Sequence, residues 1–248
     1  MIFASVATLG RVEYLNENYF APDYFTYVVI DEFHHAVNEQ YQRIVDYFKP
    51  KFLLGLTATP ERMDGKNIYE ICDYNVPYEI SLKEAINKGM LVPFHYYGIF
   101  DETDYSKLHI VRGRYELIYK YYCKYGSRQA LGFCCSREHA REMAKEFSKR
   151  GIPSVAVFSD ASGEYTEDRN VAIRQIKQGK IRVIFSVDMF NEGVDITSVD
   201  MVMFLRPTES PIVFLQQLGR GLRYSDISWK KYWPIRSLPH FMPRNSQV

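Results

Sequence analysis

The pattern of apolar and polar positions predicts alternating strands and helices in the first eighty residues. A mostly β-branched apolar run at 27–30 predicts a buried parallel strand. Apolar residues at i, i+3, i+4 and i+7 then predict an amphipathic helix over 41–48. Pro50 ends this helix, and the apolar run at 52–56 predicts a second short strand. A strand, a helix and a second strand in this order predict a parallel α/β unit.

The alternation becomes regular after Gly126. Four strands are predicted, at 130–135, 155–158, 182–186 and 199–205. The helices between them have clear boundary signals: an N-cap at Thr166, an end at Gly179 and an opening at Ser210-Pro211. Less regular elements are predicted before Gly126, namely a helix at 81–88, a strand at 93–100 and a helix at 114–125. Repeated units of this kind predict an α/β fold whose parallel sheets have helices on both faces.

Composition narrows the functional classes only slightly. The chain has 248 residues, is 46% hydrophobic and 25% charged, and carries a net charge of +1, which is typical of an ordinary globular protein. It has no apolar run of about 18 residues and no signal-peptide pattern, so we expect a cytoplasmic location and no membrane association. The four cysteines lack C-x-x-C spacing, which argues against a disulfide framework or a zinc site.

Candidate chemistry follows the first two predicted strands. Asp31 and Glu32 end the first strand, at the sheet edge where ligands bind in open α/β folds. One carboxylate can hold Mg²⁺, directly or through water, and the other can polarise an attacking water; a solvated acidic turn is the alternative. Thr57, Ala58 and Thr59 end the second strand, where the hydroxyls can reach the neighbouring carboxylates and relay the presence of a phosphate. A plain turn closed by proline is the alternative there.

Two further stretches lie in the second region. Gly193 permits close approach of a ligand to the backbone, and Asp195 can accept a hydrogen bond from a ribose hydroxyl; a turn-rich loop is the alternative. Gln216 precedes Arg220 and Arg223, which are three apart on a predicted helix and share a face. Two guanidinium groups can therefore reach one polyphosphate, although they could also complement the helix dipole.

Together these motifs resemble superfamily 2 DEAD/DEAH-box helicases. The resemblance rests on Asp-Glu-x-His, Thr-Ala-Thr, Glu-Gly-x-Asp and Gln-x-x-Gly-Arg-x-x-Arg, in that order, and spans about residues 5–223. The surroundings of the first two motifs, and the segment 206–210, are most similar to bacterial proteins related to the helicase subunits of type III restriction enzymes.

The resemblance implies two RecA-like lobes with parallel sheets, the first incomplete, and ATP with Mg²⁺ between them. It implies a partial first lobe at 1–80, a connector and start of the second lobe at 81–126, a second lobe at 127–223 and an irregular tail at 224–248. Implied roles are magnesium binding and catalysis for Asp31 and Glu32, fingers for Arg220 and Arg223, and nucleotide contacts for Gly193, Asp195 and Gln216. His34, Thr57, Ala58 and Thr59 would couple hydrolysis to movement, while Thr8 and Ser136 would contact the nucleic acid, which we expect to be double-stranded DNA.

One family motif does not occur in the chain. The phosphate-binding loop G-x-x-x-x-G-K-[ST], whose amides and lysine hold the phosphates, is absent from the sequence. We therefore expect an N-terminally truncated chain that hydrolyses ATP poorly by itself, with about two core strands in its first lobe and an open sheet edge. Two alternatives stay open: a non-hydrolysing module that binds nucleic acid or protein, and a split helicase whose loop is carried on a second polypeptide.

Overall fold

The computed structural model describes residues 1–59, 67–98, 112–190, 196, 199–206, 211–219, 221–222 and 235–238. The chain divides into two compact units, Met1–Glu79 and Ile80–Val248. Both are α/β units whose strands pair in parallel, so the fold class predicted from the sequence is confirmed. In the described part of the chain, no helix is both long and apolar enough to cross a membrane.

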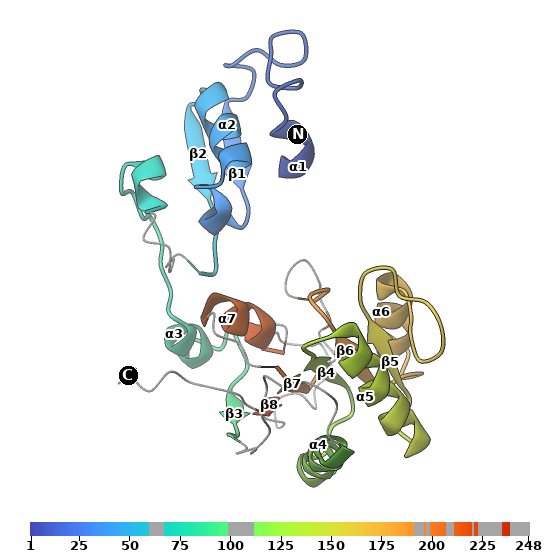
Figure 1. The fold of residues 1–248 in the computed structure, drawn as a ribbon. Coiled ribbons are helices and arrows are strands. Elements are labelled where there is room, and N and C mark those ends of the chain that lie inside the picture. The colour runs from blue at the N-terminus through green and yellow to red at the C-terminus, as the bar shows by residue number, and fades with distance from the viewer. Residues whose placement is uncertain are drawn as a thin grey trace. The chain divides into compact units, whose positions relative to one another are not determined.

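The first unit is built on a short parallel strand pair (Figure 1). β1 (Tyr27–Ile30) and β2 (Phe52–Gly55) are joined by α2 (Glu39–Tyr47), as the apolar spacing predicted. The short helix α1 (Val6–Leu9) precedes them, and the 3₁₀ turns η1 (Phe33–His35) and η2 (Tyr69–Cys72) follow the two strands. In the described residues β1 pairs only with β2, which gives a two-stranded sheet.

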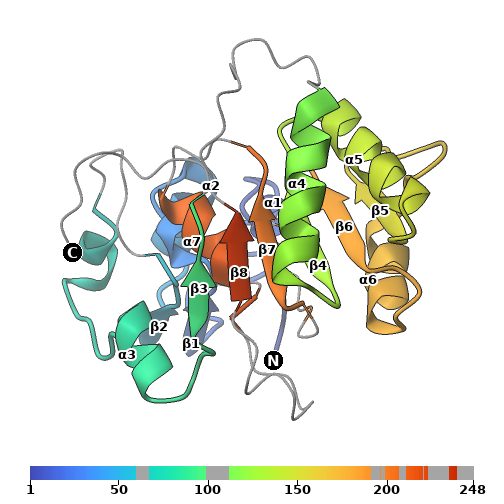
Figure 2. The same ribbon diagram turned by 90° about the horizontal axis from the view of Figure 1, so that it is seen from below.

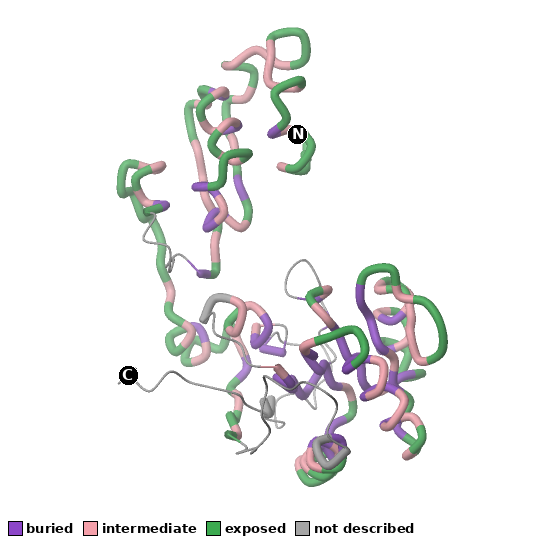
Figure 3. The backbone as a smooth tube through the Cα atoms, viewed as in Figure 1, coloured by how far each residue is buried: buried purple, intermediate pink, exposed green. Residues whose placement is uncertain are grey.

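One face of this small sheet is covered and the other is exposed. Ile30, Phe33 and Ala36 form the core of the unit with Ile68, and Val28 and Leu53 pack against it. By strand alternation the other residues of the two strands face away from this core. Along β1, exposed residues accordingly alternate with less exposed ones (Figure 3). Tyr27 is 70% exposed, Val29 58% and Phe52 49%, and Leu56, just beyond β2, is 47% exposed. Parallel sheets are normally buried on both faces, so this surface is unusual for an α/β unit.

The second unit contains a larger sheet (Figure 2). Its described strands are all parallel and lie in the order β3-β8-β7-β4-β6-β5. The strands are β3 (Phe94–Tyr96), β4 (Ala130–Phe133), β5 (Ser154–Val157), β6 (Val183–Ser186), β7 (Met201–Phe204) and β8 (Ile235–Leu238). The helices are α3 (Leu82–Asn87), α4 (Arg112–Tyr125), α5 (Arg137–Lys149), α6 (Arg169–Lys177) and α7 (Pro211–Gly219).

Here both faces of the sheet are covered. On one face, residues of α4 and α5 such as Tyr122 and Phe147 pack on Phe185 and Met203 of the sheet. On the other face, α6 and α7 pack on Leu131, Ile184 and Val202. Three neighbouring strands, β7, β4 and β6, are buried along their full length. The continuous apolar runs of the sequence therefore mark a two-sided core, as expected for parallel strands.

Two local predictions were wrong. Asp168, and not Thr166, is the N-cap of α6: its carboxylate accepts hydrogen bonds from the backbone N–H groups of Asn170 and Val171. The Thr166 hydroxyl instead donates to the carbonyl of Gly163 in the preceding turn. The tail predicted to be irregular contains β8, which pairs with β7 on one side and β3 on the other. A four-residue strand flanked by prolines leaves too short a pattern to read from the sequence.

Candidate functional site

The two carboxylates lie where β1 ends. Asp31 is exposed and follows the last strand residue, and its Oδ1 accepts a hydrogen bond from the backbone N–H of Glu32 at 2.9 Å. Glu32 adopts the left-handed conformation, with φ 50° and ψ 47°. This conformation turns the chain sharply, so that the backbone N–H of Phe33 bonds to the carbonyl of Leu56 at 2.8 Å. The ends of β1 and β2 are thereby tied together.

His34 connects the two strand ends through its side chain. The ring is only 3% exposed, and its Nδ1 lies 3.2 Å from the Thr57 hydroxyl and 3.5 Å from a carboxylate oxygen of Glu32. The Thr57 hydroxyl also accepts a hydrogen bond from the backbone N–H of Thr59 at 3.1 Å. The His34 ring therefore contacts both Glu32 and Thr57, the residues that follow the two strands.

Thr59 has the clearest unmet hydrogen-bonding capacity at the site. It is buried, and among the described residues its hydroxyl has no hydrogen-bond partner. A buried hydroxyl without a hydrogen-bond partner costs free energy. Binding of a ligand or a conformational change could supply such a partner. Ala58, between the two threonines, is exposed and leaves room beside them.

A close contact with Gly55 fixes the position of Phe33, the residue that follows the two carboxylates. A Cβ atom on Gly55 would lie 2.3 Å from Cγ of Phe33, which is far inside van der Waals contact. Only glycine therefore lets the Phe33 ring pack across β2. Since Phe33 follows Glu32 directly, Gly55 helps to hold the turn that presents the carboxylates.

The remaining predicted site residues are less informative. Thr8 is exposed on α1, and Ser136 is exposed at the N-terminus of α5, where its hydroxyl accepts from the backbone N–H of His139. Gln216 lies half-buried on α7. The other four residues fall outside the described part of the chain: Gly193, Asp195, Arg220 and Arg223.

An ion pair at the second sheet was not predicted. Arg206 follows β7 by two residues and its Nη1 lies 2.6 Å from Oδ1 of Asp188, which follows β6 by two residues. Elsewhere in the second unit, the guanidinium groups of Arg137 and Arg141 lie over the ring of Phe158. The sequence signal for this ion pair was the presence of charged residues shortly after two predicted strands, because the carboxyl ends of parallel strands share one edge of the sheet.

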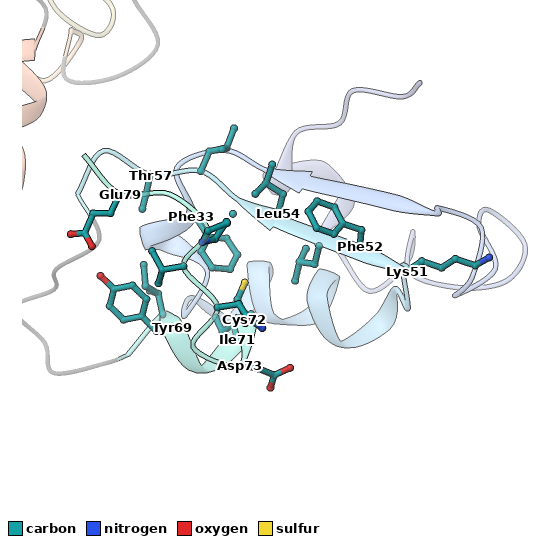
Figure 4. A pocket seen from close by; sticks show the side chains of 17 residues that line it. Phe33, Lys51, Phe52, Leu54, Thr57, Tyr69, Ile71, Cys72, Asp73 and Glu79 are labelled. Carbon is teal, nitrogen blue, oxygen red and sulfur yellow. The ribbon is translucent and has the colours of Figure 1, made fainter. Parts of the chain in front are cut away.

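A cavity of about 580 Å³ lies beside β2 within the first unit. Its wall includes all of β2 together with side chains of the η2 segment, among them Tyr69, Ile71 and Cys72 (Figure 4). Thr57 lies at the end of this wall. Burial, with a smaller contribution from Asp73, raises the pKa of the Cys72 thiol. We call this space the β2 cavity.

The donor set of the first unit fits magnesium bound together with a phosphate. Carboxylate oxygens are the hard ligands that Mg²⁺ prefers. In the described residues no group of three or more His, Cys, Asp or Glu side chains could hold a metal ion alone. This arrangement matches a metal that takes one or two carboxylates from the protein and its other ligands from water and substrate phosphates.

Two family models match the chain. Residues 1–62 match the model described as the type III restriction enzyme res subunit, and residues 113–225 match the helicase conserved C-terminal domain. The chain is 31% identical over 214 residues to a 51.5 kDa protein of a Lactococcus phage, which covers 80% of this chain and 46% of the phage protein. It is 24% identical over 256 residues to the DNA 3'-5' translocase XPB2 of Sulfurisphaera tokodaii, covering 82% of this chain and 56% of that protein.

Solved structures show the same fold at low identity. A fragment assigned as the HsdR subunit of a type I restriction enzyme from Vibrio vulnificus superposes with a TM-score of 0.65 at 22% identity, covering 89% of this chain and 45% of that one. The type ISP restriction-modification enzyme LlaBIII, bound to DNA, gives a TM-score of 0.65 at 14% identity, covering 98% of this chain and 19% of that one.

The parallel sheets and the similarity to these solved structures define a RecA-like α/β fold. Together with the family matches, they place the chain among the superfamily 2 helicases, in the branch related to restriction enzymes. The chain spans about half the length of the curated relatives described above.

Proposed function

We propose that this chain forms part of an ATP-dependent DNA helicase or translocase. The observation that supports the proposal is that one side chain, the His34 ring, contacts the residues after both strands of the first unit. Asp31 and Glu32 follow β1, Thr57 follows β2, and the His34 ring lies within 3.5 Å of both Glu32 and Thr57. In this class of enzyme the metal, when bound with ATP, neutralises the charge on the phosphates.

Within this proposal Asp31 holds the magnesium ion, directly or through water, and Glu32 orients and deprotonates the attacking water. The His34 ring is hydrogen-bonded to Thr57 and lies 3.5 Å from the Glu32 carboxylate, so it contacts both strand ends. A change at Glu32 during hydrolysis would therefore alter the Thr57–Thr59 turn. Through this contact, His34, Thr57, Ala58 and Thr59 would couple ATP hydrolysis to movement.

The second unit would supply the other functional residues. We propose nucleotide contacts for Gly193, Asp195 and Gln216, charge stabilisation for Arg220 and Arg223, and contacts with the nucleic-acid backbone for Ser136, with Thr8 of the first unit. An arginine finger is typically worth about 10³- to 10⁵-fold in rate. The domain organisation follows the same proposal: a partial first RecA-like lobe at 1–80, a connector and start of the second lobe at 81–126, and a second lobe at 127–223.

The 248 residues do not include a phosphate-binding loop. Phosphoryl transfer depends mainly on positioning and charge neutralisation, so we propose that these 248 residues turn over ATP only when a phosphate-binding loop is supplied to them. The direct test is a chimera in which a strand–loop–helix segment containing G-x-x-x-x-G-K-[ST] is joined ahead of Met1. Mg²⁺-dependent, DNA-stimulated hydrolysis that Glu32→Gln abolishes supports the proposal. A folded chimera in which Glu32→Gln changes nothing contradicts it.

A second candidate is a module that binds nucleic acid without hydrolysing ATP. It is favoured by the second unit, whose sheet is covered on both faces and whose core does not depend on the first unit. Binding to double-stranded DNA should weaken linearly in log affinity against log salt if phosphates carry it. Salt-dependent binding by the chain, together with a chimera that stays inactive, would favour this module over the enzyme.

A further inference from the structure

The helix α4 of the second unit is rich in basic residues and tyrosines. Residues 112–128, which comprise α4 and the turn that follows it, contain five basic residues, five tyrosines and a single acidic residue, Glu116. The whole chain is nearly balanced, with 31 Lys and Arg residues and 30 Asp and Glu residues. Glu116 is itself ion-paired with Arg150, at the end of α5. The positive charge of this segment is therefore not neutralised within it.

Two lysines of α4 lack the ion pairs that other lysines of the second unit form. Lys120 and Lys124 are exposed, and among the described residues neither forms an ion pair. Elsewhere in the unit a glutamate one turn away pairs with each of Lys88, Lys145 and Lys149. Residues four apart on a helix share a face and lie about 6 Å apart along its axis. The two ammonium groups of α4 can therefore contact two negative groups of one extended ligand.

Three tyrosine rings lie beside these lysines. The ring of Tyr125 stacks on that of Tyr97, which follows β3, with centroids 4.2 Å apart and planes 24° apart. It also lies nearly parallel to the ring of Tyr121, at 5.9 Å and 21°. Nζ of Lys124 lies 5.5 Å from the centroid of Tyr121 and 5.3 Å from that of Tyr125. All three rings are half-buried, and together with Lys120 and Lys124 they form what we call the α4 surface.

The α4 surface is separate from the nucleic-acid contact predicted at Ser136. α4 ends before β4 begins, whereas Ser136 follows β4 and caps α5. The last turn of α4, which holds Lys124 and Tyr125, therefore lies towards the opposite end of β4 from Ser136. None of the helicase motifs of the sequence lies in α4.

We propose that the α4 surface binds single-stranded nucleic acid. Lys120 and Lys124 contact phosphates of the strand, and a base stacks on the ring of Tyr121. Stacking on aromatic side chains suits unpaired bases of any sequence, because every base has a π-face. An acidic protein segment would engage the lysines alone, since carboxylates have no ring to stack on the tyrosines. This inference does not rest on the proposed function, because it involves neither ATP nor the carboxylates of the first unit.

The probe is a short fluorescent oligothymidylate, mixed with the full 248-residue chain in the absence of ATP. Fluorescence anisotropy measures the affinity over a range of salt concentrations. An abasic strand of the same length keeps the phosphates and removes the bases. We expect oligothymidylate to bind about fivefold or more tightly than the abasic strand. Oligouridylate is measured beside it, and the tighter of the two identifies the nucleic acid as DNA or RNA.

Paired variants test the location. Tyr121→Leu should weaken binding of oligothymidylate by about fivefold or more without changing the salt dependence, because it removes a ring and no charge. Tyr121→Phe keeps the ring and should bind as the unmodified chain does. Lys124→Gln should reduce the slope of log affinity against log salt by about 0.7 in magnitude, since one phosphate contact is lost. Lys145→Gln is the matched control, because this lysine is already paired with Glu142, and should leave the slope nearly unchanged.

Circular dichroism checks that each variant is folded. If Tyr121→Leu unfolds, photo-crosslinking of a bromouracil-containing strand to the unmodified chain gives the location, with adducts expected at Tyr121 or Tyr97. The inference is overturned if the abasic strand binds as tightly as oligothymidylate, since charge alone would then explain the binding. It is equally overturned if Tyr121→Leu and Lys124→Gln change binding no more than Lys145→Gln does, or if adducts form only outside the α4 surface. These results leave the proposed function untouched, because its test is ATP hydrolysis.

Discussion

At the scale of single residues, the site depends on a short bonded group around His34. Its Nδ1 lies between Thr57 and Glu32, at 3.2 and 3.5 Å, and the Thr57 hydroxyl also accepts from Thr59. The sequence predicted which residues end the two strands, because strand ends are local features. It could not predict that a buried imidazole joins them, since that contact depends on the register of β1 against β2.

We predict that Thr57→Val destabilises the first unit by about 1–2 kcal/mol. The substitution keeps the shape of the side chain but leaves His34 and the N–H of Thr59 without this partner. Urea-dependent hydrogen exchange at 27–30 and 52–55 measures the effect. Thr8→Val is the matched control, because Thr8 is exposed, and should stay within about 0.5 kcal/mol. Equal losses in the two variants would show that the Thr57 contacts contribute nothing to stability.

At the scale of elements, most strands and helices were predictable and their ends were not. The periodic apolar positions of α5 and the continuous apolar runs of β4 and β6 are local signals. The elements that they predicted are confirmed, since these residues lie in the core. The N-cap of α6 moved from Thr166 to Asp168, because either residue has a suitable side chain and the preceding turn decides between them. β8 was missed since its partners β7 and β3 are distant in the sequence.

The corrected cap gives a test of α6. Asp168→Ala removes the acceptor of two backbone N–H groups and should cost about 1 kcal/mol, within the range of about 0.5–2 kcal/mol typical of caps. Thr166→Ala removes one exposed hydrogen bond in a turn and should cost less. Thermal unfolding followed by circular dichroism compares the two. A larger loss for the Thr166 variant would restore the cap predicted from the sequence.

A buried tyrosine links α4 to the turn before β4. Tyr122 donates its hydroxyl to the carbonyl of Ser127, whose own hydroxyl bonds to the buried carboxylate of Asp200. Burial raises the pKa of Tyr122 from 10.0 to about 12. The folded form thus holds this proton more tightly than the unfolded chain does.

Because the folded-state pKa is the higher one, this stabilisation is complete below pH 10 and is lost as the pH rises towards about 12. We predict that unfolding by urea becomes easier over this range and that Tyr122→Phe makes the dependence shallower. The comparison is made from urea midpoints at several pH values. An unchanged slope in the variant would rule out Tyr122 as a source of the alkaline loss.

At the scale of the whole molecule, the two units differ in how fully their sheets are covered. The sheet of the second unit is buried on both faces, while that of the first has an exposed apolar face and a cavity along β2. The sequence predicted two core strands in the first unit and an open edge. It did not predict the β2 cavity, which arises from the packing of η2 at a distance along the chain.

These features support one account of the molecule. Asp31, Glu32 and Thr57 follow the two strands of the first unit, and the 248 residues contain no G-x-x-x-x-G-K-[ST] sequence. The account therefore requires that the described site be intact in geometry and silent in turnover when the chain is alone.

The most direct test is Mg²⁺-dependent ATP hydrolysis by the purified chain, with and without duplex DNA, beside Glu32→Gln. The account predicts that the chain turns over no more ATP than the variant under either condition, because positioning of the phosphates is missing. Turnover that DNA stimulates and that Glu32→Gln abolishes would contradict it, since the chain would then hold the phosphates by itself.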